Sequence, residues 1–173
     1  MIAEPDLRAA FQEHKNAVYG FAWRMSNSAT LAEDITQEVF LSLLHRPFQA
    51  DRSNDQLRSF LLGIARNLAL KHWRQDKRWK PLDDNQLVAT PPDIERLDLV
   101  DAVASAVAVL PPLQREVLIL NVYQGLSLQE IAGITGAEIG AIKARLHRAR
   151  ENLRRILAPL KNTRSSEEYG TAK

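Results

Sequence analysis

Apolar side chains recur along most of the chain at the spacing of an α-helix. In the first stripe the positions step by three or four residues, and its members are Leu7, Phe11, His14, Val18, Phe21 and Met25. A second stripe and a later one have the same spacing and comprise Leu57, Leu61, Ile64 and Leu68, then Leu99, Val103, Val107 and Leu110. Such stripes are typical of amphipathic helices. No alternating strand pattern is longer than chance, so the pattern predicts an all-α protein.

Capping residues and helix breakers predict where these helices begin and end. Thr30 and Glu33 have the spacing of a capping box, which predicts a helix that begins there and runs to about His45. The proline pair at 111–112 predicts the end of a helix, because proline has no amide hydrogen to donate and its ring crowds the preceding turn. The tail after Pro159 is polar, and we expect it to be frayed.

The charges are sorted along the chain, although the net charge is only +2. Residues 66–80 and 143–155 together hold 12 of the 23 Lys and Arg residues, whereas 83–101 is acidic and contains two adjacent prolines. We interpret this pattern as two small helical domains joined by a flexible acidic linker. The predicted boundaries are 1–80 for the first domain, 81–97 for the linker, 98–158 for the second domain and 159–173 for a polar tail. One basic block alone could be an ordinary solvated helix face.

The second domain has the outline of a helix-turn-helix. Ser127 and Glu130 have capping-box spacing and open a short helix, a glycine turn follows at 135–137, and a long basic helix comes next. On a helical wheel the side away from the core carries a small residue with longer polar ones around it, which suits a DNA groove. The residues predicted to face DNA are Lys143, Ala144, Arg145, His147 and Arg148. The alternative is a surface helix whose arginines favour its C-terminal end.

The end of the first domain mixes cations with aromatic rings. Residues 65–79 combine Arg and Lys with Trp73 and Trp79, and this combination is typical of sites that bind unpaired nucleic acid. The alternative is that the two tryptophans are partly buried core residues. Further upstream, an acidic face that carries one leucine predicts a docking surface for a basic protein partner, unless it is simply solvated. Its members are Asp34, Gln37, Glu38 and Leu41.

Composition excludes several classes of function. With no cysteine, the chain has no disulfide, thiol nucleophile or thiolate–zinc site. Its apolar stretches are far shorter than the ~20 residues that span a bilayer, and the acidic start, MIAEPDLRAAFQEHK, is not a secretory signal. We therefore expect a cytoplasmic protein without membrane insertion. The four histidines are scattered, and no phosphate loop or nucleophile elbow is present, so we expect no enzyme activity, metal, cofactor or small-molecule substrate.

Taken together, three segments resemble bacterial RNA polymerase sigma factors of the extracytoplasmic-function (ECF) type, group 4 of the sigma-70 superfamily. AEDITQEVFLSLL (32–44) is similar to the helix that docks on the clamp helices of the largest polymerase subunit. LRSFLLGIARNLALKHWRQDKRW (57–79) is similar to the segment that melts and reads the −10 element, and residues 110–154 resemble the domain that reads the −35 element. The resemblance covers roughly residues 6–157.

The resemblance implies a role for each matching residue. Asp34, Gln37 and Glu38, with Leu41 beside them, would contact core RNA polymerase, and Asn67 would help to hold a flipped −10 base. The remaining strand-binding residues are Lys71, Trp73, Arg74 and Arg78, and the −35 readers are Lys143, Ala144, His147 and Arg148. An anti-sigma protein is an expected further partner. Residues 140–145 lack two hydroxyls that the family often has, which leaves the promoter sequence open.

Two other functions are weighed against this one. A stand-alone helix-turn-helix regulator would account for residues 110–157 but would leave the acidic face and the Trp-containing basic segment without a role. A helical enzyme has no motif to support it.

Overall fold

In a computed structural model the protein is built from helices, and the structure describes residues 4–45, 53–76 and 86–168. The first lobe consists of α1 (Glu4–Ser26), α2 (Ala29–His45) and α3 (Asn54–Gln75). The second lobe consists of the short 3₁₀ turn η1 (Ile94–Arg96), α4 (Leu99–Ala108), α5 (Pro112–Leu118), the π-helical turn η2 (Ile119–Tyr123), α6 (Leu128–Thr135) and α7 (Ile139–Glu168). The described ranges contain no strand, and the predicted all-α fold is confirmed.

The first lobe is a three-helix bundle in which each helix packs against the other two. The stripes predicted from the sequence meet inside it, where Phe21, Met25, Ile35 and Leu61 are fully buried. The cap predicted for α2 is wrong by two residues. The helix begins at Ala29, and the Ser28 hydroxyl, rather than that of Thr30, accepts the amide of Leu31 at 3.2 Å. Ser28 takes this role because it directly precedes the helix and its side chain reaches the third helical amide.

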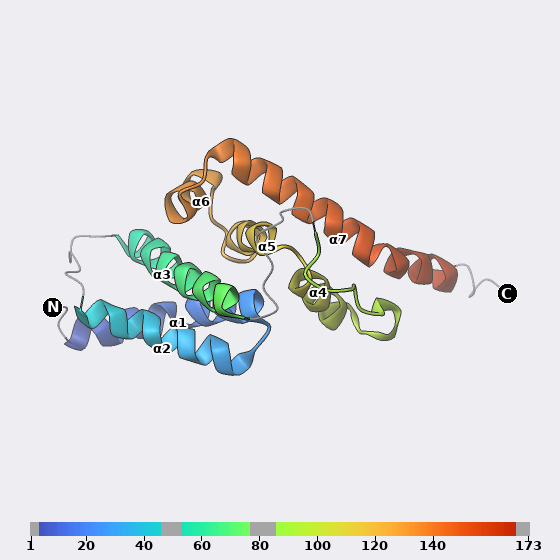
Figure 1. Ribbon diagram of the computed structural model, residues 1–173. Helices are drawn as coiled ribbons and strands as arrows, with labels where there is room; N and C mark the ends of the chain where they lie inside the picture. Colours follow the sequence, from blue (N-terminus) through green and yellow to red (C-terminus); the bar gives the residue numbers. More distant parts are fainter. Residues whose placement is uncertain (1–3, 46–52, 77–85, 169–173) are drawn as a thin grey trace.

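In the second lobe, α5 lies at the centre and α7 runs along one side (Figure 1). The capping box of Ser127 and Glu130 is confirmed at the start of α6. Gly136 ends that helix with φ of +71°, a left-handed conformation that glycine adopts without a steric penalty. The helix-turn-helix expected from the sequence is therefore present.

Helix α7 is longer than predicted. It continues through Pro159 to Glu168, so residues 159–168 do not form the frayed tail expected from their polarity. Ile156 and Leu157 pack with Ala106 and Val109 in a small cluster of their own, which holds the helix up to the proline. Proline removes a single hydrogen bond from the helix, and here the axis continues past it.

The two lobes are packed against each other. One continuous apolar cluster includes Leu62 and Leu70 of the first lobe together with Leu110 and Ile119 of the second. Helix α3 lies against α6, while α1 contacts α4, α5 and η2. The described part of the predicted linker, residues 86–97, also contacts the second lobe. Ile94 is buried, and Val88 donates its amide to the carbonyl of Val109 at 2.9 Å.

Candidate nucleic-acid and polymerase interfaces

The first turns of α7 present the predicted −35 residues. Lys143, Ala144 and His147 are exposed, whereas Arg145 and Arg148 are half-buried. The opposite side of the helix is anchored in the core by buried aliphatic residues, namely Ile142, Leu146 and Ala149. The helical-wheel assignment of an inner and an outer face is confirmed by this burial. An exposed alanine flanked by cations allows the helix to approach a groove closely.

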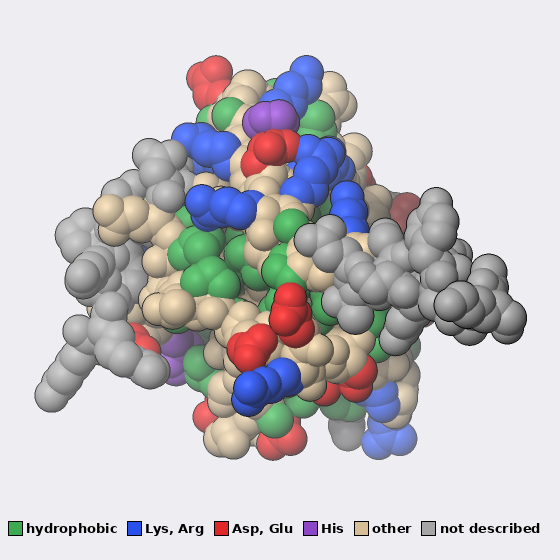
Figure 2. Space-filling model, turned by 90° about the vertical axis from the view of Figure 1, so that its right-hand side faces the viewer, with side chains coloured by type: hydrophobic (Ala, Val, Ile, Leu, Met, Phe, Trp, Pro, Cys, Tyr) green, Lys and Arg blue, Asp and Glu red, His purple; other side chains and the backbone are tan. Residues whose placement is uncertain are grey.

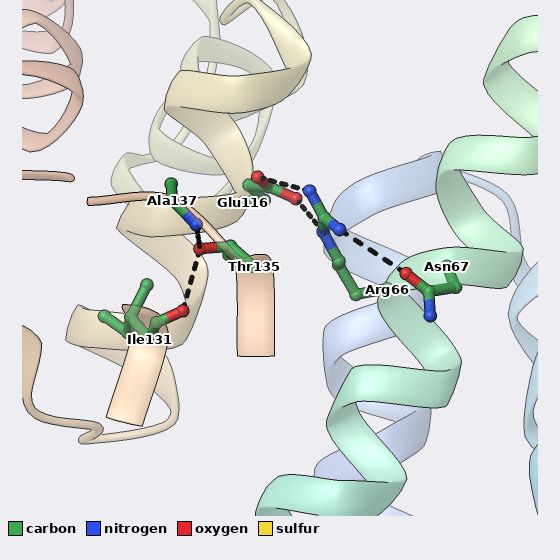
Figure 3. A network of polar contacts seen from close by, with 6 residues as sticks. All are labelled: Arg66, Asn67, Glu116, Ile131, Thr135 and Ala137. Carbon is green, nitrogen blue, oxygen red and sulfur yellow. Dashed lines mark hydrogen bonds and ion pairs between the residues drawn. The ribbon is translucent and has the colours of Figure 1, made fainter. Parts of the chain in front are cut away.

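The turn before α7 is fixed by local hydrogen bonds. The Thr135 hydroxyl donates to the carbonyl of Ile131 at 2.8 Å and accepts the amide of Ala137 at 3.2 Å (Figure 3). At the other end of α6, hydrogen bonds from the Ser127 backbone amide and side chain hold the pKa of Glu130 below its ordinary value. Hydrogen bonds therefore hold both ends of α6 in place, and they fix the angle between α6 and α7.

The predicted strand-binding residues that the structure describes lie along α3, and their side chains differ in solvent exposure. Asn67, Lys71 and Arg74 are exposed. Trp73 is half-buried, and its indole Nε1 donates to the carbonyl of Met25 at 3.1 Å. Arg78 and Trp79 lie outside the described residues. The structure thus brings three polar side chains to one exposed surface of α3 and places the tryptophan against α1.

The acidic face of α2 is solvent-exposed as the helical wheel predicts. Asp34, Gln37, Glu38 and Leu41 are all exposed, and Leu41 retains 56% of its accessible surface. An exposed leucine surrounded by acidic and amide side chains is a suitable contact for a basic partner with an apolar centre.

Sequence reasoning missed a buried arginine between the lobes. Arg115 of α5 donates to the carbonyl of Met25 at 2.7 Å in the first lobe and to those of Ala108 and Leu110 in its own lobe. Its guanidinium also stacks over the ring of Trp73, 4.8 Å from the centroid. Burial lowers the pKa of Arg115 to about 9, so the side chain is charged at neutral pH. The sequence did contain a signal of this burial, because Arg115 and Glu116 are a charged pair inside the largely apolar run 112–120.

Two further polar contacts join the lobes. Arg58 of α3 donates to the side-chain oxygen of Gln124 at 2.8 Å, and the amide of Gln124 donates to the carbonyl of Ala17 in α1 at 3.1 Å. Nearby, the guanidinium of Arg24 lies 4.2 Å from the ring centroid of Tyr123. The second lobe is therefore tied to both α1 and α3.

Cationic side chains are concentrated on one part of the surface. Figure 2 shows Lys and Arg side chains gathered on the upper part of one face, the part that α7 occupies in Figure 1, while apolar side chains fill the middle of that face. Within the described ranges no helix is both long and apolar enough to cross a membrane. In the same ranges no cluster of His, Asp and Glu is arranged to hold a metal ion.

The fold and these surfaces define a two-lobed helical protein with a helix-turn-helix in its second lobe. Two family models match the chain, Sigma-70 region 2 over residues 10–79 and Sigma-70 region 4 over residues 101–153. The chain belongs to the ECF RNA polymerase sigma factors, and the resemblance noted in the sequence is confirmed.

Individual relatives agree with this assignment. The chain is 32% identical over 154 residues to the RNA polymerase sigma factor CarQ of Myxococcus xanthus, covering 87% of this chain and 88% of CarQ. It is 31% identical to the ECF sigma factor BldN of Streptomyces coelicolor, but spans only 58% of that protein's length. Among solved structures, the sigma factor RpoE of Bartonella quintana, crystallised with the anti-sigma factor NepR, is 28% identical with a TM-score of 0.67. That match covers 88% of this chain and 97% of RpoE.

Proposed function

We propose that this protein is an alternative sigma factor that binds core RNA polymerase and directs it to promoters by reading a −35 duplex and melting a −10 element. The observation that carries the proposal is the presence, in one chain, of a helix-turn-helix with an exposed cationic helix and of an exposed acidic face on α2. A sigma factor contributes specificity and no covalent chemistry. Its place of action is the cytoplasm, where promoter DNA and polymerase meet.

In the proposed −35 contact, the first turns of α7 enter the major groove. Ala144 allows close approach, His147 and Arg148 reach base edges, and Lys143 and Arg145 contact phosphates. In the −10 contact, Asn67 helps to hold a flipped base, while Lys71, Trp73, Arg74 and Arg78 bind the separated strand. Linking two modest sites in one chain raises the effective concentration of the second site once the first is bound. The domain boundaries 1–80, 81–97 and 98–158 belong to the same proposal.

The polymerase contact is proposed for the acidic face of α2, formed by Asp34, Gln37, Glu38 and Leu41. Complementary charge steers such an encounter and fixes its orientation, whereas like charges across an interface cost several kcal/mol. We also propose an anti-sigma protein as a partner, because the structurally similar RpoE was crystallised with one.

The test is capture of core RNA polymerase by the purified protein, followed by transcription from a pool of random promoter sequences. Glu38→Arg is expected to weaken capture roughly a hundredfold, because it places a cation opposite a basic partner. The matched control is Asp6→Arg, an identical charge change at an exposed position of α1, which should capture polymerase normally. Failure of the wild-type protein to capture polymerase, with tight binding of the protein alone to duplex DNA, would favour the stand-alone regulator.

A further inference from the structure

A bidentate ion pair connects the two lobes beside the proposed −10 site. Arg66 of α3 donates from Nε to Oε2 of Glu116 at 2.7 Å and from Nη2 to Oε1 at 3.2 Å. The Arg66 side chain is 15% exposed, and the Glu116 side chain of α5 is completely buried. A paired, buried carboxylate–guanidinium contact is strong while both partners are present, and removing one partner leaves an uncompensated charge.

The same guanidinium also contacts the residue proposed to hold a flipped base. Nη1 of Arg66 donates to the side-chain oxygen of Asn67 at 3.4 Å, so Glu116, Arg66 and Asn67 form one chain of polar contacts (Figure 3). The second lobe therefore influences the orientation of the Asn67 amide through Arg66. A few turns further along α3, the guanidinium of Arg115 lies over the ring of Trp73, on a face where a base could stack.

This packed arrangement is incompatible with simultaneous reading of both promoter elements. Elements centred near −35 and −10 are separated by about 25 base pairs, or roughly 85 Å of B-form DNA. In the packed protein α6 contacts both α3 and α7, and the axes of packed helices lie about 8–10 Å apart, so α3 and the start of α7 are within roughly 30 Å of each other. The lobes must separate to reach both elements, and the predicted linker 81–97, once extended, spans up to about 60 Å.

We infer that Glu116 is an internal competitor of the promoter strand for Arg66, and that Arg66 is a further strand-binding residue that becomes available when the lobes separate. The carboxylate of Glu116 presents two anionic oxygens to the guanidinium, as a DNA phosphate does. Strand binding and lobe closure are then mutually exclusive, and the apparent affinity of the free protein for single-stranded DNA falls with the fraction of open molecules. This inference rests on the proposed function.

Lobe separation is measured on the free protein, without polymerase. The chain has no cysteine, so Ala9→Cys in α1 and Ala158→Cys in α7, both at exposed positions, give a clean dye pair for energy transfer. Glu116→Gln is expected to lower the transfer efficiency because it removes the charge that holds Arg66. Glu95→Gln, the same charge change at an exposed position, is expected to leave the efficiency unchanged. Equal efficiencies in all three proteins would overturn the inference.

Strand binding is then measured with a fluorescent single-stranded 20-mer of random sequence. We expect Glu116→Gln to bind roughly tenfold more tightly than the wild type, and Glu95→Gln to bind like the wild type. Adding Arg66→Gln to Glu116→Gln should abolish the gain. A gain that persists without Arg66 would overturn its assignment as a strand-binding residue.

A milder variant guards against a folding defect. Gln124→Ala removes the hydrogen bonds to Arg58 and Ala17 but leaves the ion pair in place. It should lower the transfer efficiency and raise strand affinity in the same direction as Glu116→Gln, by a few-fold. Unchanged efficiency and affinity in this variant would contradict the model. Because the dye measurement needs no polymerase, loss of the sigma-factor proposal would show separately, as failure of polymerase capture.

Discussion

The two basic segments of this protein have nearly the same composition but different surroundings. Residues 66–80 and 143–155 each carry six Lys or Arg residues and a single acid. On α7 the cations flank an exposed helix face, whereas on α3 Arg66 and Trp73 are engaged by the second lobe. Two segments with the same charge therefore differ in how accessible their side chains are to DNA. In the packed state the proposed −35 residues of α7 are accessible, whereas part of the proposed −10 site on α3 is covered by the second lobe.

The difference arises from how many sides of each helix are apolar. Helix α3 buries Leu61, Leu62 and Ala65 within the protein, and Leu57, Phe60, Ile64 and Leu68 around them are partly buried against the same core. Little of its circumference is left for solvent. Helix α7 begins with a single buried stripe, so its outer side is free to carry polar and cationic residues.

The largest expected effect comes from Arg115, whose guanidinium lies over Trp73 in the proposed −10 site. Arg115→Ala should lower the free energy of unfolding by about 3–5 kcal/mol, because the carbonyls of Ala108 and Leu110 lose this donor and the core gains a cavity. The carbonyl of Met25 loses one of its two donors and keeps Trp73. Urea denaturation measures the loss of stability. Arg96→Ala, whose side chain is 87% exposed, should change the stability very little. A similar small change at Arg115 would mean that the lobes are held together without it.

A smaller effect is expected on the −35 side. Arg148→Ala should reduce discrimination between the correct and an altered −35 sequence by about 1–3 kcal/mol, as expected for loss of a base contact. Competition binding of holoenzyme to the two duplexes measures it. If binding to every sequence weakens equally, Arg148 contacts phosphate instead, and the two basic segments differ less than we propose.

The capping boxes offer a matched pair, one in each lobe. Ser53 caps α3 and Ser127 caps α6. Each serine hydroxyl accepts the amide of the third helical residue, and each serine amide donates to the side chain of that residue. Ser53→Ala and Ser127→Ala should each cost about 1 kcal/mol of stability. Because the lobes share one core, both variants should lower the same single thermal transition. Two separate transitions, each sensitive to one variant, would show that the lobes unfold independently.

The smallest expected effect compares two exposed lysines. Lys71→Ala should weaken binding to single-stranded DNA about threefold and leave duplex binding unchanged, and Lys143→Ala should do the reverse. The salt dependence of binding, measured by fluorescence anisotropy, should fall by about one phosphate contact in each case. If both variants affect both forms of DNA equally, the assignment of α3 to single-stranded DNA and of α7 to duplex DNA is wrong.

Most helices and their buried faces could be predicted from the sequence, because helical periodicity is a local property. The inner and outer sides of α2 and α7 and the cap of α6 follow from spacing alone. The cap of α2 could not be placed in the same way, since Ser28 and Thr30 are both good capping residues and only the backbone path selects one. The packing of Ile156, which supports α7 up to Pro159, involves residues far away in the sequence and could not be predicted from local spacing.

The contacts between the lobes could not be predicted from the sequence at all. Arg115 meets Met25, and Arg66 meets Glu116, across 90 and 50 residues of sequence. No periodicity connects such positions, and a charged pair in an apolar run indicates burial without naming the partner. For the same reason the burial of Ile94, in the described part of the predicted linker, could not be predicted from the sequence.

The unbroken length of α7 has a mechanical consequence. Its 30 residues form a rod of about 45 Å, and its N-terminal half is rigidly joined to the helix-turn-helix. If the second lobe turns by 10° about its contact with α3, the far end of such a rod moves by roughly 8 Å. A small rotation of the second lobe therefore produces a large displacement at the C-terminal end of α7. A probe near its end reports rearrangements too slight to see at the hinge itself.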